Sequence, residues 1–208
     1  MHGISSIFFR AGGTIVPSLY HTAIDLLKTQ SEEELAVGTR DEVYNLVRSL
    51  ALGAIDAGIL RERICEMSKG KVSQDQFLGS VLNTKALDRE LLRVIDELRE
   101  TYDLYLISQY PREWLETLLN RFDEKKRFEY TNIIYCAEGG LQNLIPDLFY
   151  LVNRLTGKQM ENCLLVDGRA EYLSAALRMG LQAVVYVDAF RLRREFVLRS
   201  MLRNDRSA

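Results

Sequence analysis

The sequence is poor in the residues from which metal sites and disulfide frameworks are built. It has only three cysteines and two histidines in 208 residues. Cys65, Cys136 and Cys163 lie far apart and form no Cys-x-x-Cys pair, so the pattern argues against a zinc site and against a disulfide-stapled fold. This cysteine usage indicates a reducing compartment. Cys136 and Cys163 border predicted strands, and we expect both to be buried apolar residues.

The sequence also lacks a strong net charge, a long apolar run and any internal repeat. The net charge of −2 gives no reason to expect a nucleic-acid partner. The apolar run near the N-terminus is too short for a signal peptide or a membrane span. We therefore expect a cytoplasmic protein with neither nucleic acid nor membrane as a partner. The hydrophobic content of 47% supports one α/β domain with an insertion, or two small domains.

Five short, nearly continuous apolar runs predict strands that are buried on both faces. Amphipathic segments of helix length separate the later runs. They include Leu91–Tyr102, and also Pro111–Phe122 and Pro146–Leu155, which each begin with a proline suited to a first helical turn. Alternating strands and helices predict a parallel sheet with helices on both faces. The predicted strands are Ile4–Phe9, Leu104–Ile107, Asn132–Cys136, Cys163–Val166 and Ala183–Val187.

The stretch from Pro17 to about Ala86 breaks this alternation, because it contains no convincing strand. Turns are expected near Gly38, Gly58 and Lys69-Gly70. We predict three or four helices over residues 17–86, inserted into an α/β core formed by residues 1–16 and 87–208. Three sequences in the insertion resemble capping boxes, namely Ser31–Glu34, Thr39–Glu42 and Ser73–Gln76.

Glycines and polar residues follow the predicted strands, where open α/β sheets bind their ligands. The first strand leads into Arg10-Ala-Gly-Gly-Thr14, the second into Ser108-Gln109, and the fourth into Asp167-Gly168-Arg169. Before the fourth strand, the segment from Gly140 to Phe149 opens a helix and contains Asn143. These segments form the candidate site.

In this order the motifs resemble those of the haloacid dehalogenase (HAD) superfamily over essentially the whole chain. Gly13 and Thr14 match the end of its first motif, Asp-x-Asp-Gly-Thr, and Ser108 matches the hydroxyl residue after its second strand. Its third motif commonly reads Gly-x-x-Lys-Pro-x-Pro before a helix. Gly140 and Pro146 align with that motif.

The fourth motif and the insertion extend the resemblance. Asp167 matches the first acid of the fourth motif, which follows an apolar strand. Helices between the first two motifs are typical of the subclass with an α-helical cap, and Lys69–Phe77 is similar to the cap of small sugar-phosphate phosphatases in that group. The resemblance implies a Rossmann-like, parallel-sheet HAD core with an inserted all-helical cap.

The resemblance also implies a phosphohydrolase site whose chemistry has been removed. In the family, the first Asp is the nucleophile, the second is the acid/base, a lysine screens the phosphate, and acids hold Mg²⁺. The matching positions here are Arg10, Gly12, Asn143 and Gly168, which leaves Asp167 as the one remaining acid. An arginine is always protonated and offers no lone pair, so it can neither attack phosphorus nor bind Mg²⁺. We expect no catalytic residue and no metal, with Mg²⁺ required only if the chain is a hydrolase after all.

Two interpretations of the replaced site remain. In one, Arg10 is a structural partner of Asp167, since the first and fourth strands are neighbours in the family's sheet. In the other, the site still binds an anion, because a guanidinium group suits phosphate or carboxylate. The residues expected to line such an anion pocket are Arg10, Gly13, Thr14, Ser108, Gln109, Asn143 and Asp167.

Three hypotheses for function follow. The first is a HAD-like protein that has lost hydrolase activity and acts in binding, regulation or assembly. The second is a HAD-type hydrolase or phosphatase of a small phosphorylated metabolite, with atypical site residues. The third is a purely structural or oligomerising role. A small anion, a protein partner and a homo-oligomer all stay open. The arginine-rich segment Asp188–Arg206 is expected to be an amphipathic last helix rather than a nucleic-acid site.

Overall fold

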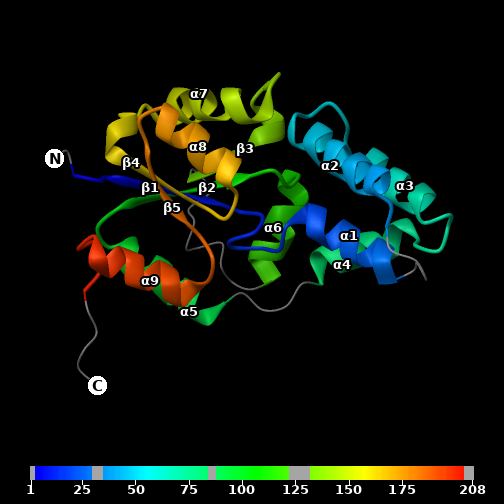
Figure 1. Ribbon diagram of the computed structural model, residues 1–208, viewed down its shortest axis with the longest axis horizontal. Coiled ribbons are helices and arrows are strands. Elements are labelled where there is room, and N and C mark those ends of the chain that lie inside the picture. Colours follow the sequence, from blue (N-terminus) through cyan, green and yellow to red (C-terminus); the bar gives the residue numbers. More distant parts are fainter. Residues whose placement is uncertain (1–2, 30–34, 84–87, 122–131, 204–208) are drawn as a thin grey trace.

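The computed structural model describes residues 3–29, 35–83, 88–121 and 132–203. In them the five strands form one parallel sheet in the order β3-β2-β1-β4-β5 (Figure 1). The predicted parallel sheet is therefore confirmed, and each predicted strand lies within a few residues of an observed one. The strands are β1 (Ser6–Arg10), β2 (Asp103–Ser108), β3 (Ile133–Tyr135), β4 (Cys163–Asp167) and β5 (Gln182–Val185).

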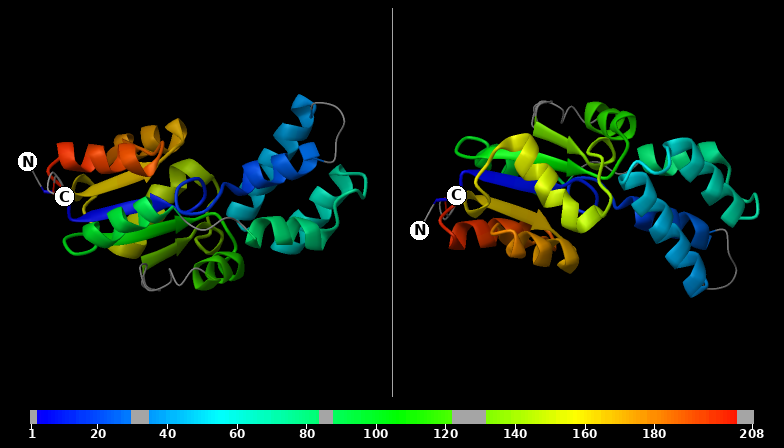
Figure 2. Two further views of the ribbon diagram at one scale, coloured as in Figure 1. Left: turned by 90° about the horizontal axis from the view of Figure 1, so that it is seen from below. Right: turned by 90° about the horizontal axis from the view of Figure 1, so that it is seen from above.

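Helices cover both faces of the sheet (Figures 1 and 2). Because side chains alternate along a strand, Ile7 and Phe9 of β1 face one helical layer and Phe8 faces the other. The layer facing Ile7 and Phe9 consists of α5 (Arg89–Leu98), α6 (Arg112–Arg121) and α9 (Ala189–Leu198). The opposite layer consists of α7 (Leu144–Thr156) and α8 (Ala170–Arg178). Short 3-10 turns, η3 (Cys136–Glu138) and η4 (Met160–Asn162), precede α7 and β4.

A group of helices between β1 and β2 extends from the carboxyl ends of the strands (Figure 2). In the described part of the chain this group consists of α1 (Leu19–Thr29), α2 (Val37–Ala51), α3 (Ala57–Met67) and α4 (Gln74–Leu82). The predicted capping box at Ser73 is confirmed: its hydroxyl accepts from Gln76 N at 3.1 Å, and Ser73 N donates to Gln76 Oε1 at 2.8 Å. The Ser31–Glu34 sequence lies outside the described residues.

Three predictions at the starts of α2 and α3 are wrong. Thr39 and Gly38 lie inside α2 rather than at a cap or turn. The buried stripe of Val43, Val47 and Leu50 stabilises a long helix, and one glycine costs such a helix only about 1 kcal/mol. Gly58 likewise lies in the first turn of α3, and the chain turns earlier, around Gly53. The predicted turn at Lys69-Gly70 is confirmed, with φ values of 54° and 75°.

The inserted helices pack firmly against the rest of the molecule. Phe77 of α4 meets Trp114 of α6 edge to face, with ring centroids 6.3 Å apart. Arg121 Nη1 donates to the carbonyl of Leu82 at the end of α4, at 2.8 Å. At Gly53, where φ is 72°, an added Cβ would lie only 2.6 Å from the Ala137 carbonyl oxygen. One apolar cluster therefore runs from the insertion into the sheet layer of α5, α6 and α9.

The three cysteines lie apart from one another in the fold as free thiols. Cys136 and Cys163 are buried, as expected, and Cys65 is partly exposed. In the described ranges, no helix combines the length and apolar character needed to cross a membrane.

Candidate functional site

Arg10 is a charged side chain in the interior of the protein. It is the last residue of β1, and only 1% of its surface is exposed. Its Nε lies 3.6 Å from Asp167 Oδ2, at the end of the neighbouring strand β4. The expected pairing of these two residues is therefore confirmed, although the separation is longer than an ideal charge-assisted hydrogen bond of about 2.8 Å.

Two further side chains complete the surroundings of Arg10. Its Nη2 donates to Gln109 Oε1 at 2.6 Å, and its guanidinium carbon lies 3.8 Å from the centroid of the Tyr172 ring. Gln109 Nε2 in turn donates to the Tyr172 hydroxyl at 2.8 Å. The three side chains thus form a closed ring of contacts. Sequence reasoning placed Gln109 in the site but missed Tyr172, whose only signal is an aromatic residue in the helix after the fourth motif.

The charges of the pair respond differently to burial. Burial alone would lower the pKa of Arg10, but Tyr172 and Asp167 outweigh it, so the pKa lies above its usual value. Burial raises the pKa of Asp167, and the opposing effect of Arg10 is smaller. Arg10 therefore keeps its charge, whereas burial makes the charged form of Asp167 less favourable than in water. Asp167 Oδ1 accepts from Arg169 N at 2.9 Å, while Oδ2 has no hydrogen-bond partner in the described residues.

Hydrogen bonds within residues 10–16 stabilise the turn after β1. The Thr14 hydroxyl donates to the Arg10 carbonyl, and Gly13, with φ at 92°, donates its N–H to the Val16 carbonyl at 2.7 Å. A Cβ at Gly12 would be in ordinary contact with Tyr110, 3.5 Å from the ring carbon Cε2. Thr14 therefore closes this turn.

Ser108 is also occupied locally. Its fully buried hydroxyl accepts from Tyr110 N at 3.0 Å and donates to the Tyr110 carbonyl at 3.1 Å. The Tyr110 hydroxyl donates to the Pro17 carbonyl at 2.7 Å, which ties the start of the insertion to the end of β2. The groups available to an incoming anion are correspondingly few.

Two other expected site residues lie apart from the buried ring. Asn143 is exposed at the N-cap of α7 and makes no capping bond through its side chain. Its backbone N–H donates instead to Asp147 Oδ2 at 2.7 Å. Gly168 is exposed, and a Cβ there would stand 3.2 Å from the Tyr186 carbonyl oxygen. This contact is tighter than side chains normally accept, so an acid at position 168 would require the backbone to shift.

The residues of the site do not fit Mg²⁺. This ion prefers oxygen ligands, including one or two carboxylates. Asp167 is the only carboxylate in the motif positions, and Arg10 faces its Oδ2. Within the described ranges, no three His, Cys, Asp or Glu side chains gather as a possible metal site.

Comparison with known proteins shows the fold. No protein-family model and no curated protein matches the chain. A predicted HAD-like family hydrolase from Porphyromonas gingivalis is similar in structure, with a TM-score of 0.70 and 18% identity over 94% of this chain and 98% of that one. A HAD family enzyme from Bacteroides thetaiotaomicron, in complex with magnesium and inorganic phosphate, has a TM-score of 0.66 and 16% identity over 89% and 95%.

A third structure extends the comparison to a dehalogenase. L-2-haloacid dehalogenase from Xanthobacter autotrophicus, with chloropropionic acid covalently bound, has a TM-score of 0.62 and 15% identity over 96% of this chain and 84% of that one. At these identities the likeness concerns the fold alone. The chain has the haloacid dehalogenase fold: a Rossmann-like parallel-sheet core with inserted helices.

Proposed function

We propose that this HAD-fold chain no longer hydrolyses phosphate esters and acts as a binding, regulatory or assembly protein. The observation that carries the proposal is the state of Arg10. It stands where the motif comparison puts the nucleophile, it is buried, and Asp167, Gln109 and Tyr172 surround it. A guanidinium group in that position blocks both attack on phosphorus and metal binding.

We propose, further, that Arg10 is a structural residue rather than an anion receptor. Its contacts are internal, and the hydroxyls of Thr14 and Ser108 are occupied by backbone groups. An anion would have to displace a buried ion pair, and unpaired buried charges are costly. The hydrolase alternative would have to use Asp167 as its acid, but this carboxyl is itself closed in beside Arg10.

An activity assay tests the proposal. Purified protein is incubated with p-nitrophenyl phosphate and a panel of sugar phosphates, with and without millimolar Mg²⁺. We expect rates equal to those of buffer, and no Mg²⁺-dependent rise in melting temperature, since a ligand stabilises only a fold that binds it. Turnover that follows the protein through gel filtration and disappears in an Asp167→Ala variant would favour the hydrolase alternative.

Two broader assignments belong to the same proposal. We place the cap at residues 17–86 and the core at residues 1–16 and 87–208. The free thiols support a reducing, cytoplasmic location.

A further inference from the structure

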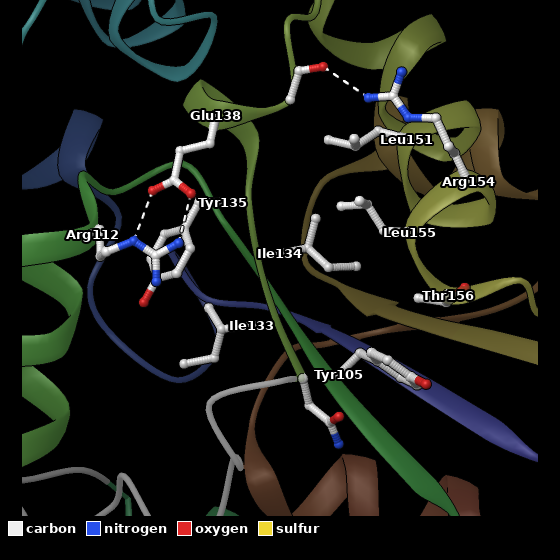
Figure 3. Close-up of a pocket in the computed structure, with 12 residues that line it drawn as sticks. Tyr105, Arg112, Ile133, Ile134, Tyr135, Glu138, Leu151, Arg154, Leu155 and Thr156 are labelled. Carbon is white, nitrogen blue, oxygen red and sulfur yellow. Dashed lines mark hydrogen bonds and ion pairs between the residues drawn. The ribbon is translucent and has the colours of Figure 1, made fainter.

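A groove of about 530 Å³ lies beside the edge strand β3 (Figure 3). It is bounded by β3, the start of α6 and the C-terminal half of α7. None of the residues that line it belongs to the candidate site around Arg10. Its size falls in the range of about 300–1,000 Å³ that is usual for small-molecule sites.

One wall of the groove is apolar. Ile134 of β3 and Leu151 and Leu155 of α7 form this wall, and Tyr105 lies at its far end (Figure 3). Leu155 is 59% exposed, so a large aliphatic side chain stands at the rim in contact with water. Covering such a wall with a flat apolar group would remove this surface from water, which is favourable.

The polar side chains of the groove leave one net positive charge, since there are two arginines and one glutamate. Arg112 is already neutralised: its Nε and Nη2 bind both carboxylate oxygens of Glu138, at 2.8 and 2.6 Å. Arg154 donates only to the Gly139 carbonyl, at 3.1 Å, and has no carboxylate partner in the described residues. Among the described residues Arg154 is therefore the cation of the groove without a carboxylate partner, and it stands next to the apolar wall (Figure 3).

We propose that this groove binds a flat, apolar organic monoanion. The apolar body would lie on Ile134, Leu151 and Leu155, and the anionic group would accept hydrogen bonds from Arg154. A guanidinium group with free donors favours a carboxylate or sulfonate in this position. The proposal goes beyond the loss of hydrolase chemistry and does not depend on it, because the groove shares no residue with the Arg10 site.

Fluorescence titration with 8-anilinonaphthalene-1-sulfonate tests the proposal. We expect one saturable site on the folded protein. Arg154→Gln should weaken binding about tenfold or more, the size of a lost charge-assisted hydrogen bond. Leu155→Glu should weaken it at least as much, because it puts a negative charge on the apolar wall. Both positions are exposed, so both variants should keep their near-ultraviolet circular dichroism and melting temperature.

Matched controls come from the end of α8. Leu177 is also 59% exposed, and Arg178 is the basic residue of the last turn of α8, as Arg154 is in α7. Leu177→Glu and Arg178→Gln should leave binding within about twofold of the parent, because neither residue lines the groove. An equal loss in these controls, or no saturable binding, overturns the proposal. Equal affinity for the uncharged N-phenyl-1-naphthylamine also overturns it.

Discussion

The guanidinium group of Arg10 lies over the ring of Tyr172, with its carbon 3.8 Å from the ring centroid. Arg10 ends β1, and Tyr172 is in α8, so this contact joins the sheet to a helix that covers it. A cation over an aromatic face is stabilised by about 2 kcal/mol when the pair is desolvated. Tyr172 therefore replaces part of the solvation that Arg10 lost on burial.

Substitutions at Tyr172 should separate the ring from the hydroxyl. We expect Tyr172→Phe to lower the free energy of unfolding by about 1 kcal/mol, because the hydrogen bond from Gln109 is lost while the ring stays under the guanidinium group. Tyr172→Leu should cost about 3 kcal/mol, because the aromatic face under the guanidinium group disappears as well. Urea denaturation measures both. Equal losses for the two variants would show that the ring contact contributes nothing.

Arg10 and Asp167 should be energetically coupled. Each single substitution, Arg10→Met or Asp167→Asn, leaves a buried polar group without its partner, whereas the double variant removes both charges. We expect the double variant to be more stable than the sum of the single effects by about 1–2 kcal/mol. A double-mutant cycle in urea provides this number. Strict additivity would mean that Arg10 and Asp167, 3.6 Å apart, do not stabilise each other.

The thiols should differ in reactivity. Burial raises the pKa of Cys136 and of Cys163 to about 11, whereas Cys65 is partly exposed. Because the thiolate is the reactive form, Ellman's reagent at pH 8 should modify about one thiol quickly in the native protein and the others only on unfolding. A Cys65→Ser variant should lose the fast phase; if the fast phase persists, a buried thiol is reactive after all.

The raised pKa values of Cys136 and Cys163 also predict how the free energy of unfolding changes with pH. The folded-state pKa values lie above the usual value of a thiol, so the stability that these groups contribute is fully present below that usual value. It is lost as the pH rises through about 11. Replacing Cys136 by Ala should therefore flatten the alkaline end of the stability curve, which chemical denaturation at several pH values would reveal.

Restoring the family's motif residues should not restore activity one residue at a time. Arg10→Asp, Gly12→Asp, Asn143→Lys and Gly168→Asp are all needed in principle, because residues of a catalytic site act as a unit. The structure adds an obstacle, since a Cβ at position 168 would meet the Tyr186 carbonyl oxygen at 3.2 Å. We expect the fourfold variant to be less stable than the parent and each single variant to be inactive with p-nitrophenyl phosphate. Clear Mg²⁺-dependent turnover by Arg10→Asp alone would contradict this expectation.

The sequence predicts the sheet well, because short continuous apolar runs such as Cys163–Val166 are typical of strands that are buried on both faces of a parallel sheet. The meeting of Arg10 and Asp167 was also predictable, since the resemblance to the HAD superfamily implies that the first and fourth strands are neighbours, as they are here. The role of Tyr172 was not, because its contact with Gln109 joins residues 63 positions apart and depends on how α8 sits on the sheet. The start of α2 was misjudged because local capping patterns say nothing of the buried stripe that lengthens a helix.

Because one apolar cluster joins the inserted helices to the sheet, the insertion cannot be exchanged without changing the core. Exchanging the insertion for that of another HAD-fold protein would separate Phe77 from Trp114. The new insertion would also need a glycine at position 53, where a Cβ would collide with the Ala137 carbonyl oxygen. A transplanted insertion would need both surfaces redesigned together. The same continuity implies that heat should melt the insertion and the sheet in one cooperative transition rather than two.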